Sequence, residues 1–305
     1  MRLVVLGAAE SGVGAAILAQ KQGYDVFVSD RGQIQPRYKQ MLDVHGICWE
    51  EGQHTEDLIL SADEVVKSPG IPETVPMVAQ LLAQGTPILS EIEFAARYTD
   101  ARMIAITGSN GKTTTTSLIY HLLRLAGEDV GLAGNIGHSL ALQVAESPHS
   151  TYVIELSSFQ LDNMYDFRAH IAVLLNITPD HLDRYDFCMQ NYVESKMRIT
   201  QNQQSTDTFI YWSEDEYVPS ELAKHPDAAQ LCGFTDAPQV GSAGYAEGDS
   251  FVIQRPVPFR MPLSELSLPG RHNLRNALAA AMAALAAGVP AEVVRQGLSD
   301  FPGVE

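Results

Sequence analysis

The stretch 105-AITGSNGKTTTTSLIYHLL-123 constrains this chain most, because it sets a glycine-rich turn between an apolar run and an amphipathic segment. Such a turn, followed by Lys-Thr at the start of a helix, offers backbone N–H groups and the positive helix end to a phosphate. The usual pattern has Gly, four residues, then Gly-Lys-Ser/Thr. Its first glycine would fall on Ile106, whereas the glycines present are Gly108 and Gly111. The sequence therefore predicts a phosphate loop of compressed spacing.

Apolar runs alternate with helical segments along the rest of the chain, as in α/β proteins. Strands are predicted over 2–6, 25–30, 102–107, 151–156 and 171–176, and helices over 13–22, 75–84 and 273–287. This order predicts a Rossmann-like N-terminal domain followed by a P-loop-type ATPase domain with a mostly parallel sheet. We expect the first domain at 1–93 and the second at 94–298, closed by the helix 273–287, with a linker starting at 299–305.

The composition excludes several classes of protein. A net charge of −17 speaks against a nucleic-acid or acidic-membrane partner. No apolar stretch reaches the roughly 20 residues of a membrane span, and the N-terminal apolar run leads directly into a glycine turn rather than a signal-peptide cleavage site. The three cysteines are odd in number and form no CxxC pair, which fits a reducing cytoplasm. Polyanionic ligands would therefore depend on local cations, metals and helix N-termini.

A first glycine loop, 7-GAAESGVG-14, follows the first predicted strand. A dinucleotide-binding fingerprint would have glycine at positions 7, 9 and 12, but position 9 is Ala9. Asp30 lies 23 residues after Gly7, where a ribose-binding acid belongs. The loop is compatible with a structural turn, with NAD binding, or with binding of another nucleotide diphosphate.

Polar residues that follow the phosphate loop complete a nucleotide site. Lys112 would reach the β- and γ-phosphates, and the hydroxyl of Thr113 would bind Mg²⁺. Glu155 ends a predicted strand, and ligands of open α/β sheets collect at the carboxyl ends of strands. Taken alone, such a glutamate is equally compatible with a solvated surface. Downstream of this loop we interpret it as a Mg²⁺ ligand, because hard cations prefer oxygen.

Two further residues are ambiguous on their own. His181 lies among acids in 176-NITPDHLDRY-185 and fits either a metal ligand or a surface residue that forms hydrogen bonds. Lys196, in the helical segment 192-YVESKMRI-199, reads as a solvated helix lysine.

Taken together, these stretches resemble the Mur ligase family, the ADP-forming amide ligases that build the peptide stem of peptidoglycan. The resemblance covers essentially the whole chain and rests on TGSNGKTT, ELSSFQLD, NITPDHLDRY, SPGIP at 68–72 and GNIG at 134–137. It is strongest to the members that join D-glutamate to UDP-N-acetylmuramoyl-L-alanine (UDP-MurNAc-L-Ala). The resemblance implies a monomeric cytoplasmic enzyme that uses ATP and two Mg²⁺ ions and proceeds through an acyl phosphate.

The resemblance also assigns roles to individual residues. It implies catalytic roles for Lys112, His181 and Lys196. ATP would be bound by Gly108, Asn110, Gly111, Lys112, Thr113, Thr114, Asn273 and Asn276. Mg²⁺ would be held by Thr113, Glu155, His181 and Lys196, the last as a carbamylated lysine. UDP-MurNAc-L-Ala would contact Ser11, Asp30, Arg31, Ser68, Pro69, Gly70, Asn135, Ser157 and Gln160.

Carbamylation adds a structural expectation for Lys196. The reaction requires the neutral amine, and at an unperturbed pKa near 10.4 only about one lysine in 2,500 is neutral at pH 7. Desolvation would raise that fraction. We therefore expect Lys196 to be buried.

The same residues are compatible with other functions. Another Mur ligase or a folylpolyglutamate synthase-like ligase would share the ATP loop but differ after Glu155. A nicotinamide-dependent oxidoreductase has no use for that loop, and a non-catalytic module could bind UDP-muramoyl peptides. The resemblance implies a third, C-terminal Rossmann-like domain that the sequence does not reach. We therefore expect this chain to bind ligands but to be impaired in catalysis.

Overall fold

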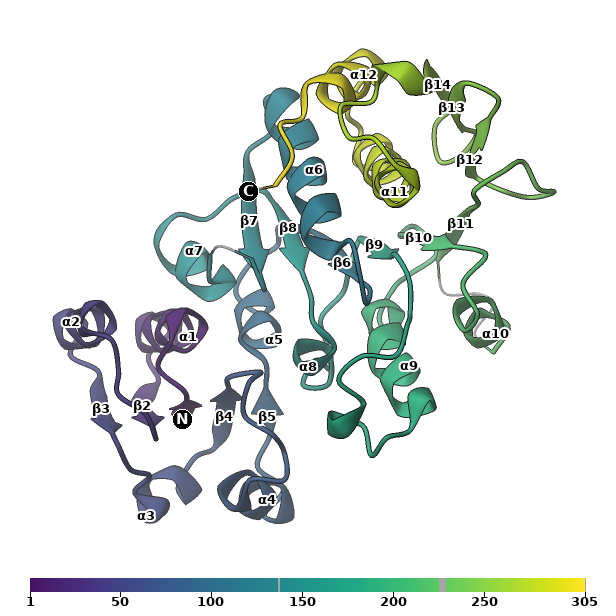
Figure 1. The fold of residues 1–305 in the computed structure, drawn as a ribbon. Helices are drawn as coiled ribbons and strands as arrows, with labels where there is room; N and C mark the ends of the chain where they lie inside the picture. Colours follow the sequence, from purple (N-terminus) through teal and green to yellow (C-terminus); the bar gives the residue numbers. More distant parts are fainter. Residues whose placement is uncertain (137, 225–228, 305) are drawn as a thin grey trace. The chain divides into compact units, whose positions relative to one another are not determined.

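A computed structural model describes residues 1–136, 138–224 and 229–304, which fall into two compact units (Figure 1). Unit 1 comprises Met1–Asp100, Gly137–His149 and Phe159–Phe167, and unit 2 comprises Ala101–Ile136, Ser150–Ser158 and Arg168–Glu305. Short segments after Ile136 and Ser158 thus belong with the N-terminal part of the chain. The domain ranges expected from the sequence remain a prediction.

Unit 1 is built on a parallel five-stranded sheet in the order β3-β2-β1-β4-β5 (Figure 1). Its strands are β1 (Arg2–Leu6), β2 (Asp25–Asp30), β3 (Cys48–Glu51), β4 (Glu64–Lys67) and β5 (Ile88–Leu89). Its helices are α1 (Glu10–Lys21), α2 (Pro36–Val44), α3 (Glu56–Leu60), α4 (Pro76–Ala83), α5 (Glu91–Ala96) and α7 (Leu140–Glu146), and α8 (Ser158–Leu161) has residues in both units. The strand order confirms the Rossmann-like prediction.

β1, the central strand of unit 1, packs side chains against both faces of its sheet, because successive side chains of a strand point to opposite sides. Val4 and Leu6 belong to a buried cluster with residues of α3 and α4. Val5 lies on the other side, beside Gly12 of α1. The helix predicted near 13–22 is confirmed as α1, which begins three residues earlier, at Glu10, and so contains Gly12. Glycine is required there because a Cβ would overlap the carbonyl oxygen of Gly7.

Unit 2 is built on a nine-stranded sheet in the order β14-β13-β12-β11-β10-β9-β6-β8-β7. The strands β6 (Arg102–Thr107), β7 (Val130–Gly134), β8 (Thr151–Glu155), β9 (Ile171–Leu174), β10 (Thr208–Trp212), β11 (Gln230–Phe234) and β12 (Gly244–Glu247) pair in parallel. β13 (Ser250–Ile253) and β14 (Phe259–Pro262) are antiparallel. The predicted mostly parallel α/β sheet is thus confirmed.

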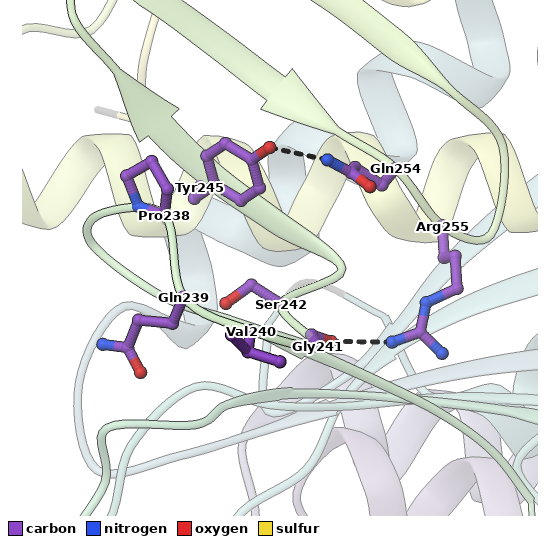
Figure 2. A pocket seen from close by; sticks show the side chains of 8 residues that line it. All are labelled: Pro238, Gln239, Val240, Gly241, Ser242, Tyr245, Gln254 and Arg255. Carbon is purple, nitrogen blue, oxygen red and sulfur yellow. Dashed lines mark hydrogen bonds between the residues drawn. The ribbon is translucent and has the colours of Figure 1, made fainter.

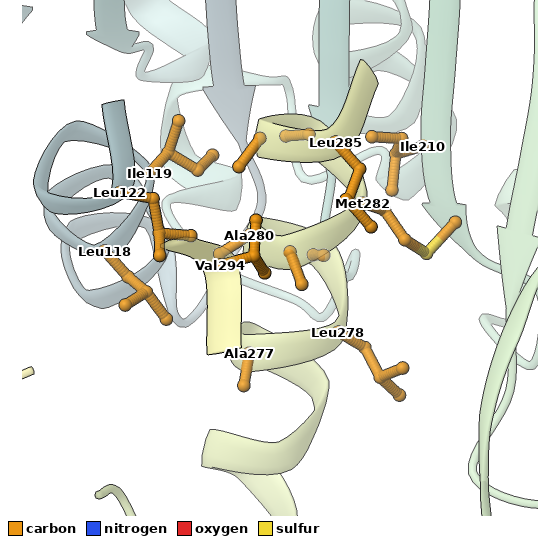
Figure 3. Packing of buried hydrophobic residues seen from close by; sticks show 14 of the residues in the cluster. Leu118, Ile119, Leu122, Ile210, Ala277, Leu278, Ala280, Met282, Leu285 and Val294 are labelled. Atoms are coloured by element: carbon orange, nitrogen blue, oxygen red, sulfur yellow. The ribbon is translucent and has the colours of Figure 1, made fainter. Parts of the chain in front are cut away.

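Three helices of unit 2 share one apolar core with the sheet (Figure 3). They are α6 (Lys112–Leu125), α11 (Arg271–Ala286) and α12 (Ala291–Asp300); α9 (Met189–Met197), α10 (Val218–Leu222) and the 3₁₀ turns η1 (Leu182–Arg184), η2 (Arg198–Thr200) and η3 (Leu263–Glu265) complete the unit. The prediction that a helix over 273–287 closes the domain is wrong, because α12 follows and packs against α6. Gly297 of α12 permits that approach, since a Cβ there would press on Leu122. Across the described ranges, no helix combines the length and hydrophobicity needed to cross a bilayer.

A buried carboxylate anchors α7 within unit 1. Glu91, the first residue of α5, is only 5% exposed. Its Oε1 accepts hydrogen bonds from the Ser139 hydroxyl at 2.7 Å and from the Ala141 N–H at 2.6 Å. Burial raises the pKa of Glu91 to about 7, against the lowering effect of these hydrogen bonds, and the nearby Glu10 carboxylate raises it further. Glu10 in turn accepts from the Ser139 N–H and lies 3.6 Å from the imidazole of His138.

We predict that Glu91→Gln flattens the pH dependence of stability between about pH 4.5 and pH 7. Because the folded-state pKa of Glu91 is raised, the native protein binds a proton that the unfolded chain has released in this range, and stability falls as pH rises. The change is on the order of 3 kcal/mol at most. Urea unfolding at about pH 5 and pH 7.5 measures it, with Glu56→Gln, at an exposed glutamate of unit 1, as the control. An equal slope in wild type and Glu91→Gln would contradict the prediction.

Candidate nucleotide site

The first glycine loop of unit 1 is shaped by Gly7 and not by position 9. Gly7 has φ +97°, a left-handed conformation that favours glycine, whereas Ala9 has φ −86° as the residue before α1. The departure from the dinucleotide pattern at Ala9 therefore causes no backbone strain. A side chain at Gly7 would also overlap Ser68, so the SPG stretch lies against this loop.

The structure brings Asp30 and Ser68 together at this loop. Asp30 accepts hydrogen bonds from the Ala8 N–H and the Gly32 N–H, both at 2.7 Å, and the Ser68 N–H donates to the Leu6 carbonyl at 2.8 Å. The other predicted substrate residues of this region are Ser11 in the first turn of α1, the exposed Arg31, and Pro69 and Gly70 after β4. The substrate-binding residues predicted in unit 1 thus lie at the carboxyl ends of β1, β2 and β4.

The phosphate loop of unit 2 has the backbone that its sequence predicts. Gly108 has φ +153°, and Gly111 has φ +86° as the residue immediately before α6. The helix begins at Lys112, so its free N–H groups face the loop. The Lys112 amine folds back onto the Gly108 carbonyl at 2.8 Å and the Ser109 carbonyl at 3.0 Å. Partial burial lowers the pKa of Lys112, and the carboxylates of Glu155 and Asp180 oppose that shift.

Glu155 lies at the end of β8 and is only 1% exposed. Its Oε2 accepts a hydrogen bond from the Thr113 hydroxyl at 2.9 Å, and its Oε1 accepts one from the Asn135 side-chain amide at 3.0 Å. Asn135 was assigned to the sugar substrate by resemblance, and here it lies beside the predicted metal ligands. Thr114 follows, partly buried, in the first turn of α6.

Two residues that hold the phosphate loop, Asn176 and Thr178, were not predicted from the sequence. Asn176 accepts from the Ser109 N–H at 2.8 Å, and its side chain exchanges two hydrogen bonds of 2.9 Å with the backbone of Asn110. Thr178 accepts from the Ser109 hydroxyl and donates its N–H to that oxygen, both at 2.9 Å. The polar ending of β9 was the available signal, but nothing in the sequence indicated its partners.

His181 lies three residues further along this segment. It has a left-handed φ of +50°, its side chain is 59% exposed, and its Nε2 lies 3.6 Å from a carboxylate oxygen of Asp180. Its role as a metal ligand stays a prediction.

Lys196 is only 2% exposed, which confirms the expectation that it is buried. Its amine donates to the Gly108 carbonyl at 2.9 Å, the same oxygen that Lys112 contacts, and lies 4.7 Å from the centre of the Tyr192 ring. The residue that reads as a solvated helix lysine in sequence is therefore buried and hydrogen-bonded to the glycine loop.

The start of α11 also meets the phosphate loop. A Cβ at Gly111 would overlap the side-chain oxygen of Asn276, so these two residues lie in direct contact. The Asn276 amide donates weakly, at 3.5 Å, to Asn273, whose own amide donates to the Pro269 carbonyl at 2.9 Å. The structure thus brings Asn276 to the loop, and Asn273 is linked to the loop only through Asn276.

The remaining predicted residues follow Glu155. Ser157 is partly buried in unit 2 and Gln160 is buried in unit 1. In the GNIG stretch, Gly137 lies outside the described residues.

The described ranges contain no cluster of three His, Cys, Asp or Glu side chains arranged to hold a metal. Mg²⁺ does not require one, because it is usually bound through one or two carboxylates, substrate phosphates and water. The buried Glu155 carboxylate next to the Thr113 hydroxyl and the phosphate loop fits that mode.

A depression of about 490 Å³ lies elsewhere in unit 2, between the loop after β11 and the end of β13 (Figure 2). Arg255 donates to the Gly241 carbonyl there and Gln254 donates to the Tyr245 hydroxyl. None of the residues predicted from the sequence lines it.

Comparison with known proteins places the chain among peptidoglycan ligases. The sequence profile of the Mur ligase middle domain matches residues 106–284, and that of the MurD N-terminal domain matches residues 2–76. UDP-N-acetylmuramoylalanine–D-glutamate ligase of Bacteroides fragilis is 63% identical over 304 residues, which span 100% of this chain and 68% of that protein. The ligase of the same name from Christiangramia forsetii is 47% identical over 305 residues, with 68% of its length covered.

Solved structures agree in fold. The UDP-N-acetylmuramate:L-alanyl-gamma-D-glutamyl-meso-diaminopimelate ligase from Neisseria meningitides has a TM-score of 0.69 at 22% identity, over 100% of this chain and 99% of that one. MurC from Thermotoga maritima has a TM-score of 0.58 at 21% identity, over 100% of this chain and 69% of that one.

We predict that Gly111→Ala destabilises unit 2 more than Gly127→Ala does. Both glycines have left-handed φ, of +86° and +79°, so both variants should lose about 1–2 kcal/mol. A side chain at position 127 meets nothing, whereas one at position 111 overlaps Asn276 and also presses on Leu175, which adds ~1–3 kcal/mol. Urea unfolding measures the difference, and Asn276→Ala in the Gly111→Ala background should recover most of it. Equal losses at the two positions would contradict the contact.

Proposed function

Because the chain belongs to the Mur ligase family, we propose that it acts as an ATP-dependent ligase that joins D-glutamate to UDP-MurNAc-L-Ala in peptidoglycan precursor synthesis. We place it in the cytoplasm as a monomer, with small-molecule substrates. The observation that carries the proposal is the hydrogen bond from Thr113 to the buried Glu155 beneath a glycine loop at the start of a helix. This arrangement suits a triphosphate with its metal.

The proposed reaction has two steps. A carboxylate oxygen of UDP-MurNAc-L-Ala attacks the γ-phosphorus of ATP, the bond from that phosphorus to the bridging oxygen breaks, and ADP leaves. The amine of D-glutamate then attacks the acyl carbon of the acyl phosphate and loses a proton, and inorganic phosphate leaves as the amide forms.

The first step requires two anions to meet. Two unit charges of like sign about 4 Å apart repel by roughly 4 kcal/mol at an effective dielectric near 20, and a carboxylate and a triphosphate present several such pairs. Lys112 lies within the loop to offset this repulsion. An ammonium has three donors, so its two bonds to loop carbonyls leave one for a phosphate oxygen.

Mg²⁺ would supply the remaining charge compensation. Thr113 and Glu155 are the residues that would hold the first ion. We further propose a second Mg²⁺ ion, with His181 as one of its ligands. Bound metal neutralises charge that develops on the transferred phosphoryl group. Asn135 keeps the Glu155 carboxylate oriented by occupying its second oxygen.

Carbamylation of Lys196 would resolve an electrostatic conflict. Two lysine amines, those of the partly buried Lys112 and the buried Lys196, both donate to the Gly108 carbonyl oxygen. Two ammonium groups repel each other there, which favours loss of a proton from one of them. The neutral amine is the form that reacts with carbon dioxide, and the resulting carbamate is an anion that attracts Lys112 and can support a metal.

The substrate assignment is tested by calorimetric titration of the chain with UDP-MurNAc-L-Ala, UDP-MurNAc, ATP with Mg²⁺, and NADH. We expect binding of ATP and of the alanyl nucleotide, with weaker binding of UDP-MurNAc and no binding of NADH. Arg31→Ala should weaken binding of the alanyl nucleotide roughly ten- to a hundredfold, because a charge-assisted hydrogen bond contributes ~1.5–3 kcal/mol. Lys21→Ala, an exposed basic residue of the same unit, is the control. No binding of either nucleotide, or binding of NADH, would contradict the proposal.

The Lys196 assignment is tested without any activity assay. We expect ¹³C-bicarbonate to give a carbamate carbonyl resonance in the NMR spectrum of the wild type, because the neutral amine of Lys196 takes up carbon dioxide. Lys196→Arg retains the charge but not the reactive amine, so the resonance should disappear. The Lys39→Ala control, at a lysine of unit 1, should keep it. A resonance that persists in Lys196→Arg would show that another amine is modified.

A further inference from the structure

Asp215 is a buried acid to which neither the sequence analysis nor the proposed chemistry assigns a task. It follows β10 and is only 6% exposed. Its carboxylate accepts three backbone hydrogen bonds, from Ile177 at 2.7 Å, Tyr217 at 2.9 Å and Val218 at 3.2 Å. Within the described part of the chain no Lys, Arg or His forms an ion pair with it. Burying a carboxylate without a cationic partner costs free energy unless N–H groups satisfy its oxygens.

The two carboxylate oxygens serve different segments. Oδ1 accepts from Tyr217 and Val218 and so closes the turn that leads into α10. Oδ2 accepts from Ile177, which lies 38 residues earlier, just beyond the end of β9. Because β9 and β10 are parallel neighbours, their carboxyl ends are adjacent, and Asp215 bridges the segments that follow them. A turn-forming aspartate needs only the first of these contacts.

Ile177 lies at the centre of the segment that holds the phosphate loop. Its neighbours Asn176 and Thr178 make the hydrogen bonds to Ser109 and Asn110 described above. Ile177 itself makes none of them; its N–H is bonded to Asp215 and its side chain is 2% exposed. The carboxylate therefore fixes the middle residue of a three-residue support.

We propose that Asp215 is a positioning residue for the nucleotide site, which holds 176–178, and through it Ser109 and Asn110, in the phosphate-binding shape before ATP arrives. The inference rests on the proposed function, since it takes the loop to bind ATP. A loop that is already ordered avoids an entropic penalty on binding, so loss of this support should appear as weaker nucleotide binding.

The Asp215→Asn variant should keep the hydrogen bonds that form the turn before α10 but lose the one to Ile177. An asparagine has one acceptor oxygen and one NH₂ group, which only donates. If the oxygen keeps the two bonds to Tyr217 and Val218, the NH₂ group faces the Ile177 N–H and the bridge to the loop support is lost. The turn before α10 is then retained.

Asp207→Asn provides a matched control at the opposite end of the same strand. Asp207 precedes β10, is 3% exposed, and accepts from the Gln204 N–H at 2.7 Å as well as from Arg168. It too is a buried acid that organises backbone, but its bonds do not reach the segment 176–178. Any general loss of stability in unit 2 should therefore affect both variants.

The experiment measures the dissociation constant of ATP with Mg²⁺, that of UDP-MurNAc-L-Ala, and the melting temperature for wild type and both variants. We expect Asp215→Asn to weaken ATP about tenfold, with the alanyl nucleotide unchanged, and Asp207→Asn to leave ATP binding unchanged. Unchanged ATP binding in Asp215→Asn, or an equal loss in Asp207→Asn, would overturn the inference. Absence of ATP binding in the wild type would instead remove the proposed function.

If Asp215→Asn does not fold, amide hydrogen exchange of the wild type tests whether Asp215 holds Ile177 in place before ATP binds. The Ile177 amide should be protected in the nucleotide-free protein to the same degree as amides of β9, because Asp215 already holds it. Exchange of Ile177 at the rate of an exposed amide, with protection only after ATP is added, would overturn the inference.

Discussion

The organisation of unit 2 depends on one carboxylate that is buried at the end of a strand. Glu155 is almost completely removed from solvent, and a charge in that position must be matched by donors. Thr113 at the start of α6 and Asn135 after β7 supply them. The bond from Thr113 ties the start of α6 to the end of β8, and the bond from Asn135 ties the segment after β7 to the same carboxylate. The need to satisfy one buried carboxylate therefore shapes both the fold and the predicted site.

Parallel pairing is what makes such a site possible. β6 lies between β8 and β9, and the registers align Ile106 with both Glu155 and Val173. The phosphate loop, the buried acid and the polar segment after β9 are therefore delivered to one edge of the sheet. The strongly negative chain thus presents local positive groups at this edge, the N-terminus of α6 and the Lys112 amine, to the polyanions that we propose it binds.

The features that could be predicted from the sequence are those with a local signature. The glycine loop, the strand that ends at Glu155 and the parallel α/β layout each follow from spacing and periodicity. α12 was missed because α11 had already been taken to close the domain, and the burial of Lys196 was inferred from chemistry, since its helix reads as solvated. Asp215 lies in an acidic stretch whose sequence indicates no function. Its environment depends on Ile177, 38 residues away, and no local pattern encodes such a contact.

The contact between Gly111 and Asn276 ties the phosphate loop to the start of α11. Asn273 lies one turn earlier on the same helix and accepts a hydrogen bond from Asn276, so both residues predicted to lie near the adenine belong to one rigid element. The predicted base site and the phosphate loop are therefore mechanically coupled. Any displacement of α11 along its axis would disturb both of them together.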